Sequence, residues 1–111
     1  MAKLEKYRDA IKQVIRNYQQ YTKADSPVEA QIMFDTEHDH YQLVHVGWEK
    51  QRRVYGCILH FDIKNEKVWV QHNGTEGNVA DELIDLGVDK LDIVLGFHSP
   101  YKRQFTEFAV G

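Results

Sequence analysis

Hydrophobic side chains recur at alternating spacings of three and four along the first 22 residues of the chain. This spacing is typical of an amphipathic helix and predicts one over residues 2–22. Asp25, Ser26 and Pro27 follow, and because proline disfavours helix in the residue before it, the helix should end ahead of them. The predicted apolar face is formed by Leu4, Tyr7, Ile11, Val14, Ile15, Tyr18 and Tyr21.

Beyond the proline the pattern changes to alternation of apolar and polar residues, which is typical of strands. Strands are expected over residues 30–35, 41–48, 54–63 and 68–72. The segments between them are short and polar, so neighbouring strands should be joined by turns. The sequence therefore predicts an antiparallel meander of about four strands.

The third of these strands has the clearest alternation. One set of side chains is expected to face the core, namely Tyr55, Cys57, Leu59, Phe61 and Ile63. The opposite set contains His60 and Asp62. Because Cys57 belongs to the core set, the single cysteine is expected to be a buried, unreactive thiol.

The second half of the chain predicts a short helix and one more extended segment. Thr75 and Glu76 can cap a helix that runs to about Leu86, and Gly87 suits the left-handed residue after its end. Residues 93–97 should be a strand or an extended segment. The fold class predicted is α+β, with a long N-terminal helix, the antiparallel β-meander, a short second helix, a strand and an irregular C-terminal segment.

Composition limits the class of protein. The 111 residues are 42% hydrophobic with a net charge of −3, which predicts one folded domain over residues 1–111. The first residues are charged where a secretion signal is apolar, and no apolar run approaches the roughly 18 residues of a membrane span. A single cysteine excludes an intrachain disulfide. We therefore expect a cytoplasmic protein with no membrane segment.

Basic side chains gather in two places on this acidic chain. Residues 1–24 hold six basic and two acidic side chains, and Arg52 and Arg53 lie beside Trp48 and Tyr55. Positive charge mixed with aromatic surface suits single-stranded nucleic acid, although surface charge is often only solvated. The candidate nucleic-acid contacts are Lys12, Arg16, Arg52 and Arg53.

Motifs that carry catalytic chemistry are absent from the sequence. It has no phosphate-binding glycine loop, no dinucleotide-binding glycine motif, and no HExxH, GxSxG or CxxC. His38 and His40 could share one face of a strand, and His60 or His72 could join them. Two imidazoles alone do not make a zinc site, so no metal, cofactor or catalytic residue is expected.

Several short strings of residues occur in a fixed order over nearly the whole chain. They are Val46-Gly47-Trp48, Arg52-Arg53, Gly56 to His60, Val68 to Gln71, Gly74 to Gly77, Ala80 to Leu83 and Asp92 to His98, followed by Pro100, Arg103, Thr106 and Phe108 to Val110. Their joint order and spacing resemble the fdxN element excision controlling factor XisI family, found chiefly in cyanobacteria.

The resemblance implies an accessory factor without established catalytic activity. Members of the family act with XisH, a companion that looks like a nuclease-fold enzyme, and with a separate site-specific recombinase when a DNA element is excised during heterocyst development. We therefore expect a non-enzymatic regulatory protein with an XisH-like partner and an indirect association with DNA. The candidate partner residues are Trp69, Gln71, Thr75, Glu76, Gly96, His98, Pro100, Arg103 and Thr106.

Other functions stay open at this stage. A direct DNA-binding factor would use the basic residues given above, and a homodimer could form through the tyrosine-bearing helix, Trp48 and Trp69. A small hydrolase or nuclease-type subunit would use His98, Arg103 and Thr106 with either Glu76 or Asp81. The structural alternative is that His98 and Arg103 only tie the tail together, because most polar side chains satisfy backbone groups.

Overall fold

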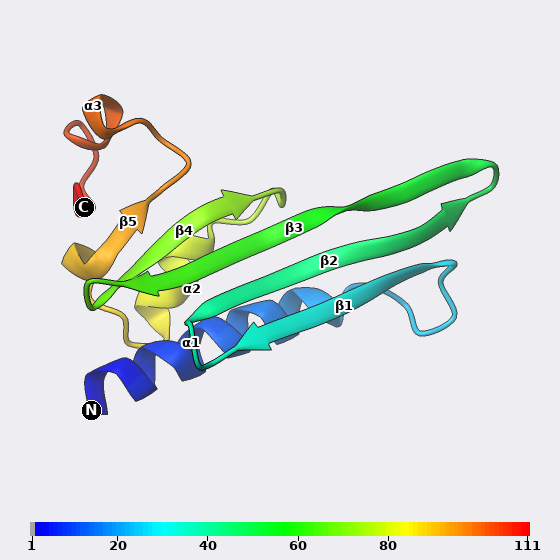
Figure 1. Ribbon diagram of the computed structural model, residues 1–111, viewed down its shortest axis with the longest axis horizontal. Coiled ribbons are helices and arrows are strands. Elements are labelled where there is room, and N and C mark those ends of the chain that lie inside the picture. Colours follow the sequence, from blue (N-terminus) through cyan, green and yellow to red (C-terminus); the bar gives the residue numbers. More distant parts are fainter. Residues whose placement is uncertain (1) are drawn as a thin grey trace.

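The computed structural model describes residues 2–111 and has the α+β fold that the sequence predicts. A single five-stranded sheet has the order β1-β2-β3-β4-β5, antiparallel except for the parallel pair β4 and β5. The elements are α1 (Ala2–Gln19), β1 (Val28–Asp35), β2 (His40–Glu49), β3 (Arg52–Lys64), β4 (Lys67–Asn73), α2 (Val79–Asp85), the 3₁₀ helix η1 (Lys90–Asp92), β5 (Ile93–Leu95) and α3 (Pro100–Arg103). Helices α1 and α2 pack on one face of the sheet (Figure 1).

Helix α1 uses the apolar stripe that its sequence predicts. Tyr7, Ile11 and Val14 are buried against the sheet. The helix ends at Gln19, three residues before the predicted end, and Tyr21 is exposed. The apolar spacing continues into the turn that follows the helix, and for this reason the pattern overestimates its length.

Strand β3 contradicts part of the predicted alternation. Ile58 is an extra residue in the ladder with β2, so β3 has a β-bulge there. A bulge reverses which side chains face the core beyond it. Leu59 and Phe61 are fully buried as predicted, but Tyr55 is exposed and Cys57 is only half-buried, so the prediction that these two belong to the core is wrong. Partial burial still raises the pKa of the Cys57 thiol and keeps it protonated.

Helix α2 begins later than predicted. Asn78, rather than Thr75, caps it, and the Asn78 side chain accepts a hydrogen bond from the backbone N–H of Asp81. The Thr75 N–H and hydroxyl instead both donate to the Asn73 side chain, at 2.9 and 2.6 Å. The Thr75 hydroxyl oxygen accepts from the Gly77 N–H at 3.1 Å, so it serves this turn and not the start of α2. Gly87 follows the helix with a φ of 102°, as predicted.

The C-terminal segment has more regular structure than the sequence predicts. Ser99 caps α3 by accepting from the Lys102 N–H, with Pro100 at the start of the helix. The Ala109 N–H then donates to the Ile93 carbonyl at 2.8 Å, so the tail returns to the sheet beside β5. Within residues 2–111, no helix is long and apolar enough to cross a membrane.

Gly47 of β2 packs closely against the backbone of Pro27 and Val28, at the start of β1, and substitution of Gly47 tests this contact. A Cβ at this position would lie 2.2 Å from the Pro27 carbonyl oxygen and 2.7 Å from the Val28 Cα, and these backbone atoms have little room to move. We expect Gly47→Ala to lower the free energy of unfolding by about 1–3 kcal/mol in urea titrations. Gly56→Ala on β3 is the matched control, because a Cβ there meets nothing within 4 Å. Equal effects of the two substitutions would contradict this account.

Asp92 links α1 to the segment before β5 and predicts a pH dependence. Its carboxylate accepts from the Tyr7 hydroxyl at 2.6 Å and pairs with Lys3 at 3.0 Å. Burial alone would raise the pKa of Asp92, but these contacts outweigh it and the net pKa is lowered. A carboxyl with a lowered folded-state pKa stabilises the protein above its unfolded pKa, and this stability is lost as the pH falls through the folded value.

We therefore expect the wild-type protein to lose more stability than Asp92→Asn as the pH falls from about 5 to about 2. Urea unfolding at a series of pH values measures this difference. If the two proteins lose stability in parallel, the contacts of Asp92 with Tyr7 and Lys3 do not stabilise the fold.

Candidate functional site

The sheet face opposite α1 and α2, called the outer face here, carries a row of polar and aromatic side chains. His40, Asp62 and Trp69 are successive partners across β2, β3 and β4. Directly paired residues of neighbouring antiparallel strands project from the same face. Alternation along β2 and β3, with the bulge at Ile58, places further side chains on this face, and they include Gln42, Val44, Trp48, Arg53, Tyr55, Cys57 and His60.

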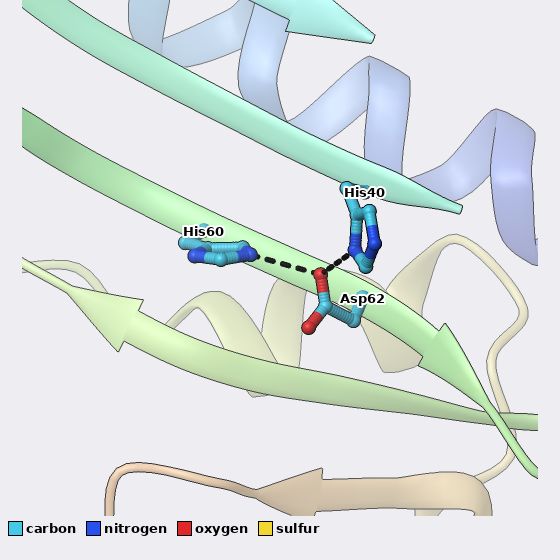
Figure 2. A group of neighbouring side chains, drawn as sticks. All are labelled: His40, His60 and Asp62. Atoms are coloured by element: carbon cyan, nitrogen blue, oxygen red, sulfur yellow. Dashed lines mark hydrogen bonds and ion pairs between the residues drawn. The ribbon is translucent and has the colours of Figure 1, made fainter. Parts of the chain in front are cut away.

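A single carboxylate organises one end of the outer face (Figure 2). Asp62 Oδ1 lies 2.8 Å from His40 Nδ1 and 2.8 Å from His60 Nε2. Its other oxygen, Oδ2, accepts a hydrogen bond from Gln71 Nε2 at 3.0 Å. The carboxamide nitrogen of Gln42 lies 3.4 Å from His60 Nδ1. Asp62 thus connects three strands through side-chain contacts.

Local strand geometry explains why these groups meet. His60 and Asp62 are two residues apart on β3, so they share a face, and His40 is the direct partner of Asp62 on β2. Gln71 is the extra residue of a second bulge, which lies between β3 and β4. A bulge re-aims the side chain at its position, and here the Gln71 carboxamide reaches Asp62.

The hydrogen bonds keep the Asp62 carboxylate ionised. Burial alone would raise the pKa of Asp62, but the hydrogen bonds from His40, Gln71 and His60 outweigh it, so the net pKa is lowered. The hydrogen bond to Asp62 is also the main cause of a raised pKa at His40. Asp62 is therefore an ionised carboxylate between two imidazoles.

Four of the candidate partner residues pack together next to this cluster. Trp69 is only 8% exposed, and its ring centroid lies 5.0 Å from the Arg103 guanidinium and 4.6 Å from Lys64 Nζ. A Cβ at Gly96 would lie 2.5 Å from Gln71 Oε1 and 3.2 Å from Trp69 Cε3. Trp69, Gln71, Gly96 and Arg103 therefore hold β4, β5 and the tail together.

The remaining tail candidates bond to backbone groups. Arg103 Nε donates to the His98 carbonyl at 3.0 Å, and the Thr106 hydroxyl donates to the Arg103 carbonyl at 3.0 Å. In the part of the chain that the structure describes, neither Glu76 nor Asp81 shares a hydrogen bond or ion pair with these three residues. This arrangement favours a structural role for His98 and Arg103, which hold the tail together, over a catalytic site of the kind that a hydrolase would need.

Thr75 and Glu76 lie at a different place. With Tyr18 and Tyr21 they line a surface groove of about 510 Å³ beside the C-terminal end of α1. The Tyr18 hydroxyl also donates to Glu82 of α2. The candidate partner residues therefore divide among this groove, the packed cluster around Trp69 and the C-terminal tail.

An exposed aromatic cluster lies at the far end of the outer face. The guanidinium of Arg53 lies 5.4 Å from the Trp48 ring centroid and 5.9 Å from that of Tyr55. Trp48 is 52% exposed and Tyr55 is 73% exposed. The β2–β3 hairpin that carries them extends beyond α1 and α2 (Figure 1). These three residues are called the hairpin-tip cluster below.

The four candidate nucleic-acid contacts do not form one patch. Lys12 and Arg16 of α1 lie over the ring of Phe34, at 5.9 and 5.4 Å from its centroid. Phe34 pairs with Tyr41 of β2, whereas Arg53 pairs with Trp48 of β2. Tyr41 and Trp48 are about 23 Å apart along β2. Arg52, next to Arg53, is ion-paired with Glu49 at 2.7 Å.

Sequence reasoning considered His40 with His60 but missed Asp62 as the group between them. The signal was present, because residues two apart on a strand share a face and His60 and Asp62 have that spacing. The pairing of His40 with Asp62 depends on the register between β2 and β3. The pattern of either strand alone does not give that register.

Arg103 tests the packed cluster. Replacing it with alanine removes the guanidinium from the face of Trp69 and the donor to the His98 carbonyl. We expect Arg103→Ala to lower the free energy of unfolding by about 1–2 kcal/mol in urea titrations. Lys102→Ala, at the exposed neighbouring position of α3, is the control and should change it by less than about 0.5 kcal/mol. Equal effects would contradict the role of Arg103.

Comparison with known proteins relates this architecture to solved structures. A XisI-like protein from Anabaena variabilis ATCC 29413 is 46% identical, with a TM-score of 0.91 over 97% of this chain and 99% of that chain. The fdxN element excision controlling factor XisI from the same organism is 34% identical, with a TM-score of 0.85 over 98% and 99% of the two chains. No curated protein matches the chain. The family model described as XisI protein matches residues 1–110, and the chain belongs to the XisI family.

Proposed function

We propose that this protein is a non-enzymatic accessory factor that controls excision of a DNA element through an XisH-like partner. The observation that carries the proposal is the similarity to the fdxN element excision controlling factor XisI, which extends over 98% of this chain and 99% of that protein. Fold and chain length are shared from end to end, so the likeness is not confined to a common module. This supports a role of the same kind, in control of excision.

The hairpin-tip cluster suits a partner-docking role. Tryptophan, tyrosine and arginine are the residues that contribute most to binding at protein interfaces. Arg53 lies over the rings of both Trp48 and Tyr55, so the three side chains are already ordered before a partner binds. Ordering in the free protein lowers the entropic cost of association. The XisH-like partner would therefore contact the tip of the β2–β3 hairpin.

The distribution of charge supports an indirect association with DNA. The net charge is −3, and the two basic groups lie at opposite ends of β2 on an acidic chain. Arg52 is also neutralised by Glu49. A protein that holds DNA by itself needs several basic contacts on one surface. A partner that contacts the DNA removes this requirement.

Titration calorimetry with an XisH-like protein from the same organism tests the proposal. We expect micromolar or tighter binding, and we expect Trp48→Ala and Tyr55→Ala each to weaken it about tenfold or more, because buried aromatic anchors typically contribute at least 1–2 kcal/mol. Tyr101→Ala is the matched control, since Tyr101 is 71% exposed, like Tyr55, but lies on α3. It should leave the affinity unchanged.

Three outcomes would contradict the proposal in different ways. No heat and separate elution of the two proteins would remove the partner. Binding that Tyr101→Ala weakens and the hairpin variants do not would move the docking surface to α3. Binding of DNA by the isolated protein, with a steep loss of affinity as salt increases, would favour the direct DNA-binding alternative.

A further inference from the structure

His40, His60 and Asp62 offer three metal-ligand atoms within a small volume. Nδ1 of His40, Nε2 of His60 and a carboxylate oxygen of Asp62 all lie within 4.8 Å of one another. Both ring nitrogens point at the same carboxylate oxygen (Figure 2). The three side chains come from paired positions of β2 and β3, so a sheet, rather than a flexible loop, holds them in place.

The donor set matches the chemistry of divalent transition metals. Two imidazole nitrogens and one carboxylate oxygen occur together in catalytic zinc sites and in the 2-His-1-carboxylate sites of iron. Around a tetrahedral zinc ion with bonds of about 2.0–2.1 Å, neighbouring ligand atoms are about 3.3 Å apart. The 2.8 Å contacts to Asp62 Oδ1 need to lengthen by only about half an ångström to reach this spacing.

Outer contacts hold the ligands as they do in known metal sites. Ligating carboxylates and imidazoles usually have their second polar atom bonded to a neighbouring group. Gln71 Nε2 bonds to Asp62 Oδ2, so Oδ1, which faces the two rings, is the oxygen that would bind a metal. The Gln42 carboxamide lies beside His60 Nδ1, the ring nitrogen opposite the ligand atom. With its amide turned, its oxygen accepts the proton that His60 Nδ1 carries when Nε2 binds a metal.

The degree of exposure leaves room for a further ligand. The Asp62 side chain is 14% exposed and the His60 side chain 28%, whereas the His40 side chain is 57% exposed. An ion bound here would therefore be held by the sheet on one side and open to solvent on the other. Water, or a donor group from another molecule, would complete its coordination.

We propose that His40, His60 and Asp62 bind a divalent transition-metal ion, with Zn²⁺ as the best fit, and leave at least one coordination position open. The imidazoles bind as neutral ligands through His40 Nδ1 and His60 Nε2, and the carboxylate binds through Oδ1. The bound ion replaces the two hydrogen bonds that now join the rings to Asp62. This site is separate from the hairpin-tip cluster, so a test of metal binding does not depend on the proposed partner.

Zinc titration of the tag-free protein after treatment with a chelator tests the site. We expect about one Zn²⁺ per chain by mass spectrometry, a Kd of about 10 μM or lower by calorimetry, and a higher melting temperature in the presence of the ion. Co²⁺ substituted for Zn²⁺ should give the visible absorption of a four- or five-coordinate ion, which reports the geometry directly.

Variants separate this site from incidental binding. His40→Ala and Asp62→Asn should weaken Zn²⁺ binding by at least about a hundredfold, and Gln71→Ala by about tenfold, since outer contacts typically contribute 10- to 100-fold. His38→Ala is the matched control, because His38 forms a similar pair with Asp35, at 2.9 Å, and no third ligand joins them among residues 2–111. Circular dichroism of each metal-free variant establishes that it is folded.

Two results would overturn the proposal. One is the absence of saturable Zn²⁺ binding to the wild-type protein. The other is binding that Asp62→Asn and His40→Ala weaken no more than His38→Ala does. Either result would leave the cluster as a set of hydrogen bonds that joins β2 to β3.

Discussion

The register between β2 and β3 is the constraint on which the outer face depends. These two strands form the longest pair of the sheet, and the bulge at Ile58 divides their alternation into two parts. On one side of the bulge, Leu59 and Phe61 face the helices and Asp62 faces outward beside His40. On the other side, the bulge keeps Tyr55 on the same outer face as Asp62. One extra residue therefore places the Asp62 cluster and the hairpin-tip cluster on a single surface.

The second constraint is the close approach of β5 to β4. Gly96 lies against Gln71 and Trp69, where a side chain would meet both. This approach lets Arg103 of the tail lie on Trp69 while Gln71 reaches Asp62. Four residues of the strings by which the sequence resembles its family, Trp69, Gln71, Gly96 and Arg103, therefore pack the tail against the sheet. Such residues preserve a shape, and the surface that contacts a partner can lie elsewhere.

Much of the fold could be predicted from the chain because its signals are local. The stripe on α1, the polar turns between strands and Gly87 after α2 each depend on residues close in sequence. The errors arose where structure depends on distant contacts. Alternation along β3 alone predicts that Tyr55 and Cys57 face the core. The bulge at Ile58, which turns both outward, arises only when β3 is paired with β2.

The same distinction explains the candidate site. His60 and Asp62 have a recognisable spacing, but His40 joins them only through the strand register. The sequence predicts a mixture of charge and aromatic surface at Trp48, Arg53 and Tyr55. The structure adds that the Arg53 guanidinium lies over both rings and so orders the three side chains. The sequence predicts Thr75 as the cap of α2, but the Thr75 hydroxyl oxygen accepts from the Gly77 N–H of the preceding turn. Competition between neighbouring polar groups decides such cases, and composition does not reveal the outcome.

Because the hairpin projects beyond the helices, its base and its tip differ in how easily their hydrogen bonds open. Near Leu59 and Phe61 the strands are covered by helices and buried in the core, so their hydrogen bonds open only with much of the fold. Near Trp48 and Tyr55 the same strands extend beyond α1 and α2, so local opening there disturbs little of the core (Figure 1). The tip can bend or twist toward a surface that it meets while the base keeps its shape. The tip of the hairpin is therefore the deformable part of this strand pair, and its base is the rigid part.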